Sequence, residues 1–261
     1  MKISFKNRVA LISGSSQGIG KAIAKKFAAA GANLILTSND KKTLEIAQQE
    51  ISSYGTRVIS IYGDLRQEKH IDKVVKDALT QFGKVDFLIN NVGSIGRISP
   101  FEDIAPDEWY ELFSLNVMSG IHFSRKLLPS MKENGFGKIL FISSEKAIEP
   151  GVLMTHYAMT KSAQLSITKS LANEYGKYGI SVNSISPGVI VTPSWYEEAH
   201  KNNLSPEDYA RQFCNNVFDS QALGAPEDVA ELAYFLCSDS ARWITGSNFR
   251  IDGGSVKSIG I

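Results

Sequence analysis

The sequence predicts an α/β fold, a Rossmann-type doubly wound, seven-stranded parallel sheet with helices on both faces. Short continuous apolar segments alternate with longer segments whose apolar residues recur every three or four positions. The first pattern is typical of strands covered on both faces, and the second is typical of amphipathic helices. A glycine-rich turn joins the first such strand to the first helix. Because no linker, repeat or low-complexity stretch interrupts the alternation, we expect a single domain over residues 1–261.

The predicted elements follow one another from residue 8 to residue 254. Strands are expected at 8–13, 33–37, 57–62, 85–90, 138–144, 180–186 and 246–254. Helices are expected after the glycine turn and at 40–51, 68–82, 105–131, 157–175 and 225–238. Asp40 is suited to cap the second of these helices. The segment 105–131 is either one long helix or a kinked pair, with Pro106 in its first turn.

Residues 189–220 form the least regular part of the chain and are long for a plain connection. Segments of this kind in compact α/β domains are often lids or binding loops. Trp195, Tyr196 and Phe213 either contact a ligand or pack the segment onto the body of the protein. The pattern leaves both interpretations open.

Composition limits the class of protein. The chain has 261 residues, 43% of them hydrophobic and 21% charged, with a net charge of +1, which is ordinary for a globular protein with a substantial core. Basic residues form no block that would follow a nucleic acid or an anionic membrane. Cys214, Cys237 and the four histidines are dispersed, so no metal site is expected. The short apolar run near the N-terminus is too short for a signal peptide or a membrane span, and we expect a cytoplasmic protein.

Three side chains suggest catalysis. Tyr157 and Lys161 lie four residues apart in a segment of helical composition, so both emerge on one face. A neighbouring ammonium favours the phenolate and lowers the pKa of a tyrosine, which makes the phenol a useful acid or base at neutral pH. Ser144 ends an apolar strand thirteen residues earlier. The three groups together could meet one carbonyl oxygen, although a Tyr–Lys pair at this spacing is also common on solvated helices.

The glycine turn suggests a dinucleotide. Gly14, Gly18 and Gly20 follow a strand and open a helix, so main-chain N–H groups and the helix dipole can face a pyrophosphate. The spacing is G-x-x-x-G-x-G, which differs from the usual G-x-G-x-x-G fingerprint.

From Arg8 to Gly254 the chain resembles the short-chain dehydrogenase/reductase family, including its 3-oxoacyl carrier-protein reductase and glucose dehydrogenase-like members. The resemblance rests on a serine followed by Tyr-x-x-x-Lys and on the family's TGxxxGIG turn, with Ser13 in place of threonine. It implies an enzyme that interconverts a carbonyl and a secondary alcohol with NAD(P)(H).

The resemblance also implies the role of each catalytic residue. Tyr157 would be the acid or base, Ser144 would hydrogen-bond the reacting oxygen, and Lys161 would tune the phenol and hold the nicotinamide ribose. Asn116 would disturb its helix so that its main-chain carbonyl holds a water of a proton relay.

Cofactor contacts are implied position by position. Asp64 would contact the adenine and Ile190 the carboxamide, while Asn91 and Gly93 would line the cleft next to a structural Asn90. The full set of expected cofactor-binding residues is Gly14, Ser16, Gln17, Gly18, Ile19, Gly20, Ser38, Asn39, Asp64, Leu65, Asn91, Gly93, Tyr157, Lys161, Pro187, Gly188, Ile190 and Thr192.

The end of the second strand favours NADP(H) over NAD(H). NAD-dependent relatives place an acidic residue where Ser38 stands, to bind the ribose hydroxyls and repel a 2′-phosphate. That repulsion is missing here, as is the arginine that many NADP-dependent relatives carry at the position of Asn39. Lys41 or Lys42 could supply a cation, and Asp40 would turn toward its own helix as a cap.

The substrate stays open between a sugar or polyol, a 3-oxoacyl thioester and another ketone. Glu145 and Glu149 flank the expected substrate side and suit either a polyhydroxylated or cationic substrate or a solvated surface. The competing function is a nucleotide-sensing or scaffold protein on the same fold. A helix that is apolar on more than one face, through Ala163, Leu165 and Ile167, together with the resemblance, predicts a homotetramer.

Overall fold

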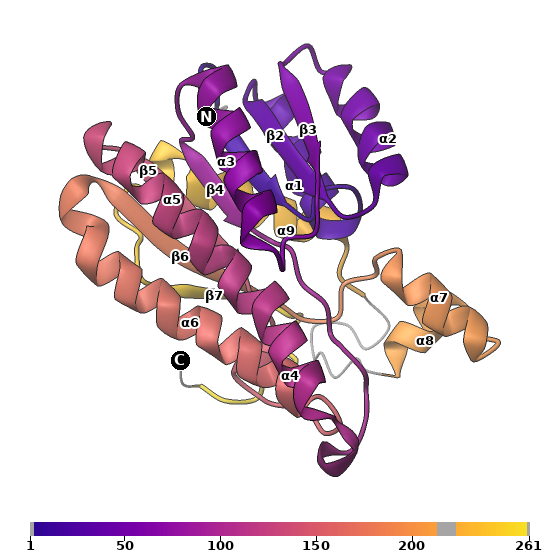
Figure 1. Cartoon of the computed structure of the whole chain (residues 1–261). Coiled ribbons are helices and arrows are strands. Elements are labelled where there is room, and N and C mark those ends of the chain that lie inside the picture. The colour runs from indigo at the N-terminus through magenta and orange to yellow at the C-terminus, as the bar shows by residue number, and fades with distance from the viewer. Residues whose placement is uncertain (1–2, 213–222, 260–261) are drawn as a thin grey trace.

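The fold is built on one seven-stranded parallel sheet in the order β3-β2-β1-β4-β5-β6-β7 (Figure 1). The computed structural model describes residues 3–212 and 223–259. The strands are β1 Val9–Ser13, β2 Asn33–Ser38, β3 Val58–Tyr62, β4 Phe87–Asn90, β5 Gly137–Ile142, β6 Ile180–Pro187 and β7 Asn248–Ile251. The order reverses direction between β1 and β4, which confirms the doubly wound fold and places a crevice at the carboxyl ends of these strands.

Helices cover both faces of the sheet, as the sequence predicts (Figure 1). One face carries α1 Gly18–Ala29, α2 Lys41–Ser52 and α9 Pro226–Cys237. The other carries α3 Glu68–Phe82, α5 Ser119–Glu133 and α6 Thr155–Tyr175. Short 3-10 turns occur at Phe101–Asp103, Glu145–Ala147, Gly176–Tyr178 and Asp239–Ala241.

Each strand feeds two cores because its side chains alternate between the faces. In β1, Ala10 and Ile12 pack under α1 and α9, whereas Val9 and Leu11 pack under α3 and α5. All four are buried, which explains why the strand reads as one continuous apolar run.

The long helix predicted at 105–131 is interrupted. It consists of α4 Pro106–Phe113, a π-helical turn Ser114–Met118 and then α5. Within the turn the N–H of Ser119 donates to the Ser114 carbonyl, five residues back. Asn116 lies in this turn, so the disturbance predicted for its helix is present.

The irregular segment predicted at 189–220 contains two short helices, α7 Ser194–Lys201 and α8 Pro206–Arg211. Trp195 packs against Tyr209 of α8, with ring centroids 5.8 Å apart. Phe213 and Cys214 lie outside the described residues.

Two further findings concern the parts of the chain that the structure describes. None of the helices there is both long and apolar enough to span a membrane. No group of three or more histidine, cysteine or acidic side chains among those residues could hold a metal ion.

Candidate active site

A glycine turn at the carboxyl end of β1 forms one end of the site. Gly14 and Gly18 have φ values of 64° and 54°, in the left-handed region that favours glycine. A Cβ on Gly20 would stand 2.2 Å from the Gly14 carbonyl oxygen, so the turn closes only with glycine at that position. Thr192 lies against Gly18, since a Cβ there would meet its methyl group at 3.3 Å. The turn and the segment after β6 therefore meet, as expected.

The start of α1 fits an anionic pyrophosphate. Its N-cap residue Gln17 makes no capping hydrogen bond with its side chain, and the first turn contains no acidic residue. The main-chain N–H groups there form the positive end of the helix dipole, and no side chain of the cap or the first turn offsets that charge. The residues present therefore fit the phosphates of a dinucleotide.

Asn91 has a different place from the one predicted. Its Nδ2 donates to the main-chain carbonyls of Ser13 and Gly14 at 2.8 and 2.9 Å. The side chain thus ties the end of β4 to the glycine turn and does not line the cleft, whereas Val92 and Gly93 do line it. Asn90 is buried, and neither atom of its amide has a hydrogen-bond partner among the residues that the structure describes.

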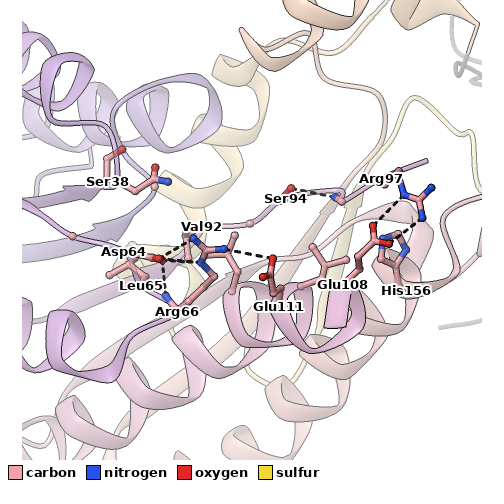
Figure 2. Close-up of a pocket in the computed structure, with 17 residues that line it drawn as sticks. Ser38, Asp64, Leu65, Arg66, Val92, Ser94, Arg97, Glu108, Glu111 and His156 are labelled. Atoms are coloured by element: carbon pink, nitrogen blue, oxygen red, sulfur yellow. Dashed lines mark hydrogen bonds and ion pairs between the residues drawn. The ribbon is translucent and has the colours of Figure 1, made fainter. Parts of the chain in front are cut away.

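A cleft of about 410 Å³ lies at the carboxyl ends of β1 to β4 and runs along the loop after β4 (Figure 2). Ser38, Asn39, Asp64 and Leu65 line it, as the sequence predicts for the adenosine end. Asp64 is held by Arg66, whose Nε and Nη2 donate to the carboxylate at 3.0 and 2.9 Å. This hydrogen bonding lowers the pKa of the Asp64 carboxyl.

Arg66 is a lining residue that the sequence reasoning missed. Its guanidinium lies between Asp64 and Glu111, the latter at 3.7 Å (Figure 2). The signal available was a basic residue two positions after the predicted adenine-binding aspartate, a pattern that is too common on loops to be decisive alone.

At the end of β2, Ser38 is buried and its hydroxyl lies 2.9 Å from that of Ser16 in the glycine turn. Asp40 accepts a hydrogen bond from the Thr43 N–H at 3.1 Å, which confirms it as the cap of α2. Lys41 pairs with Glu45 at 3.9 Å, so its ammonium is directed along its own helix.

Ser144 and Tyr157 come together at the end of β5. The Ser144 hydroxyl lowers the pKa of the Tyr157 phenol, but burial of Tyr157 is the larger effect and raises that pKa. The charge of Glu145 raises it further. The net direction is upward, so the predicted lowering by Lys161 is not found in this structure.

Lys161 is buried and faces other partners. Its Nζ donates to the Ile142 carbonyl at 2.8 Å and lies 5.7 Å from the centroid of the Tyr157 ring. Burial lowers the pKa of Lys161 to about 7. A Cβ on Gly93 would stand 3.4 Å from this ammonium, so Gly93 lies beside Lys161 at the edge of the cleft.

Both polar atoms of the Asn116 side chain and its main-chain carbonyl form hydrogen bonds. Its side chain donates to the Ser94 carbonyl and to the Thr160 hydroxyl at 2.9 and 3.0 Å, and its Oδ1 accepts from the Ser94 N–H. Its main-chain carbonyl accepts from Nε2 of Gln164 at 2.6 Å. The resemblance implies a water on this carbonyl, and here a side-chain amide occupies that position.

In the segment after β6, the Ile190 carbonyl accepts a hydrogen bond from the Trp195 indole at 2.7 Å. The predicted contact of the Ile190 backbone with a carboxamide stays a prediction. Gly188 lies where a Cβ would stand 2.8 Å from the Asp252 Cα, so it permits close approach of the chain. Trp195 therefore holds parts of the 189–220 segment together, through Ile190 and Tyr209.

Glu145 and Glu149, considered for substrate contact, hold the C-terminal segment. Glu145 accepts from the Ser255 hydroxyl and pairs with Lys146 at 2.9 Å. Glu149 accepts from the Lys257 N–H at 3.0 Å. Both carboxylates have partners within the chain, which removes the argument for a cationic substrate.

Comparison with known proteins identifies the family. A family model described as enoyl-(acyl carrier protein) reductase matches residues 14–256. The 7alpha-hydroxysteroid dehydrogenase of Escherichia coli K12 is 33% identical over 252 residues, which cover 97% of this chain and 95% of the relative. The chain belongs to the short-chain dehydrogenase/reductase family. It is an oxidoreductase of hydroxyl and carbonyl groups that uses NAD(P).

Solved structures of this family have the same fold. L-sorbose reductase from Gluconobacter frateurii, complexed with NADPH and L-sorbose, has a TM-score of 0.93 at 32% identity and covers 99% of this chain and 100% of its own. A 7α-hydroxysteroid dehydrogenase complexed with NADH and 7-oxo glycochenodeoxycholic acid has a TM-score of 0.87 at 32% identity, covering 99% of this chain and 98% of its own. These two short-chain dehydrogenases therefore differ in the nicotinamide cofactor they hold.

Proposed function

We propose that this short-chain dehydrogenase/reductase interconverts a small-molecule ketone and a secondary alcohol through Asn116, Ser144, Tyr157 and Lys161. One observation carries the proposal. The Ser144 hydroxyl at the end of β5 lies near enough to the Tyr157 phenol to lower its pKa, and the buried Lys161 lies one helical turn after Tyr157. Two neighbouring hydroxyl groups can both donate a hydrogen bond to the same carbonyl oxygen and so hold it in place.

In the direction of reduction, Tyr157 donates its proton to the carbonyl oxygen while Ser144 donates a hydrogen bond to the same oxygen. The raised pKa of the phenol keeps it protonated at neutral pH, as a proton donor must be. The nicotinamide, when bound, supplies the hydride that the carbonyl carbon gains. The glycine turn would hold the pyrophosphate, Asp64 and Leu65 the adenine, Lys161 the nicotinamide ribose, and the segment Pro187–Thr192 the nicotinamide.

We propose NADP(H) as the preferred cofactor. The support comes from the adenosine end of the cleft, where Ser38 and Asn39 place no carboxylate beside the ribose. Arg66 adds a cation to the same lining, although Asp64 and Glu111 share it. A 2′-phosphate would meet hydroxyl, amide and guanidinium donors there.

A turnover panel tests the proposed function. Ketoses, oxosteroids and 3-oxoacyl thioesters are each offered with NADPH and with NADH, polyols are offered with NADP⁺ and with NAD⁺, and the reduced cofactor is followed by its absorbance. We expect turnover of at least one carbonyl class by the wild type and its loss in Tyr157→Phe. Tight cofactor binding without turnover of any compound would instead support the sensor function.

The remaining proposals concern the whole protein. We propose a cytoplasmic homotetramer in which residues 1–261 act as one catalytic domain. The apolar residues Ala163, Leu165 and Ile167 of α6 are only half-buried, while the polar Thr160, Gln164 and Thr168 face inward. A helix with polar residues facing inward and apolar residues left half-exposed has an apolar face that another subunit could cover. We also propose that the 189–220 segment covers the substrate side of the site.

A further inference from the structure

Gln164 stands one helical turn after Lys161 on α6, and its side chain is 1% exposed. Both the nitrogen and the oxygen of its side-chain amide form hydrogen bonds. Nε2 donates to the Asn116 main-chain carbonyl at 2.6 Å, and Oε1 accepts from the Lys161 Nζ at 3.4 Å. The side chain therefore connects two of the four proposed catalytic residues.

The Asn116 carbonyl meets this amide because of the π-helical turn. In a regular helix a carbonyl is used by the N–H four residues later, whereas a π-helical turn shifts that pattern by one residue. The turn Ser114–Met118 lies against α6, where Gln164 faces inward. A carboxamide is well matched to this position, since it carries a donor for the carbonyl and an acceptor for the lysine.

Lys161 depends on its acceptors. Its ammonium is buried, and it donates to the Ile142 carbonyl and to Gln164. In a buried site, each acceptor that faces an ammonium stabilises the charged form and fixes where its protons point. The bond from Gln164 to Asn116 in turn prevents its Oε1 from rotating away.

We propose that Gln164 is a positioning residue that holds Lys161 by bridging its ammonium to the Asn116 main-chain carbonyl. The bridge stands where the family resemblance implies a water. The inference rests on the proposed function, because positioning matters only if Lys161 serves the reaction.

The first test measures the lysine and needs no substrate. Protein labelled with ¹³C at lysine Cε is titrated by NMR, and the Lys161 signal is assigned by its loss in Lys161→Arg. Gln164→Met keeps the length of the side chain but removes both hydrogen bonds. We expect the midpoint of the Lys161 titration to move to lower pH in Gln164→Met. An unchanged midpoint would overturn the bridge.

The second test compares the turnover of two variants. Gln164→Ala leaves room for a water between the Asn116 carbonyl and the Lys161 ammonium, both of which are polar partners for it. Gln164→Met fills that space with apolar atoms. We expect kcat to fall about tenfold or more in Gln164→Met and to stay within about threefold of wild type in Gln164→Ala. A side chain that served only to pack the core would give the opposite order, because alanine leaves the larger cavity.

Thr168→Val is the matched control. The Thr168 hydroxyl is buried one turn further along α6 and donates to the Gln164 main-chain carbonyl at 2.8 Å, away from Lys161. This variant is expected to keep both kcat and the lysine titration. If the wild type turns over none of the carbonyl compounds, the proposed function fails, while the titration still decides the bridge.

Discussion

Tyr157 illustrates how opposing influences act on a single group. Burial and the Glu145 carboxylate raise the pKa of its phenol, while the neighbouring Ser144 hydroxyl lowers it. Lys161, the residue expected to lower it, instead donates to the Ile142 carbonyl. The phenol is therefore protonated at neutral pH in this structure, which suits the donation of a proton to a carbonyl oxygen.

Replacing this phenol tests its role directly. In Tyr157→Phe the ring stays and the phenol proton is removed. We expect kcat to fall by about 10² to 10⁴-fold, the range typical of a general acid. Cofactor affinity, measured by fluorescence titration, should change little. A variant that retains more than roughly a tenth of the wild-type rate would show that another group protonates the substrate.

The cofactor preference depends on Ser38. Its hydroxyl lies 2.9 Å from that of Ser16, so a carboxylate at this position would stand at the adenosine end of the cleft. We expect wild-type protein to bind NADPH more tightly than NADH, and Ser38→Asp to reverse that order by repelling a 2′-phosphate.

Paired fluorescence titrations of both cofactors measure this preference, with Ser38→Asn as the uncharged control. The control should weaken both cofactors similarly and leave their order intact. Tighter binding of NADH by the wild type would contradict the proposed preference.

Single residues also show where sequence reasoning ends. The placement of Ser144 after a strand, with Tyr157 and Lys161 one turn apart on a helix, could be predicted from their spacing in the sequence. Gln164 and Arg66 could not, because each acts through a partner distant in sequence, Asn116 in one case and Glu111 in the other. The use of the Ile190 carbonyl by Trp195 was unpredictable for the same reason.

At the scale of elements, α4 and α5 show what periodicity can decide. The sequence between Ala105 and Met131 has a helical pattern throughout, and it left one helix and a kinked pair as alternatives. The structure has a continuous helical path with a π-helical turn at its middle. An apolar pattern cannot separate these arrangements, because the inserted residue in a π-helical turn shifts the pattern by only about 100°.

The start of α6 holds an unusual histidine. His156 is 1% exposed, and neither of its ring nitrogens has a hydrogen-bond partner among the described residues. Its ring lies against Trp109 of α4, with centroids 5.8 Å apart. Burial is the main cause that lowers the pKa of His156, with Glu108 raising it and Arg97 lowering it.

This lowered pKa predicts how stability depends on pH. Below the unfolded-state pKa of about 6.5 the unfolded chain binds a proton at this histidine that the folded chain refuses. Stability should therefore fall as pH decreases from about 6.5 toward the folded-state pKa. Thermal unfolding at pH 7.5 and 5.5 measures it, and the loss should be smaller in His156→Leu than in wild type. Equal losses in both proteins would show that His156 titrates normally.

At the scale of the molecule, the fold could be predicted almost completely. Parallel strands buried on both faces are continuous apolar runs, and this signal is strong for β1, β2, β4 and β5. The right-handed connection of successive strands then leaves few arrangements. Assembly leaves a weaker signal, because a helix face covered by another subunit has the same composition as one covered by the chain itself.

The number of subunits in the assembly can be tested by mutation of an exposed apolar surface. Apolar side chains stand exposed on the α4–α6 side of the molecule, with Tyr110 at 74% and Phe101 at 64%. A two-fold contact that pairs this surface with itself would bury them. We expect sedimentation at micromolar concentration to give a tetramer for wild type and smaller species for Tyr110→Glu. Ile46→Glu, at an exposed apolar residue on α2, should stay tetrameric. A monomer for the wild-type protein would contradict the proposed tetramer. The inward-facing polar residues of α6 would then serve only the active site.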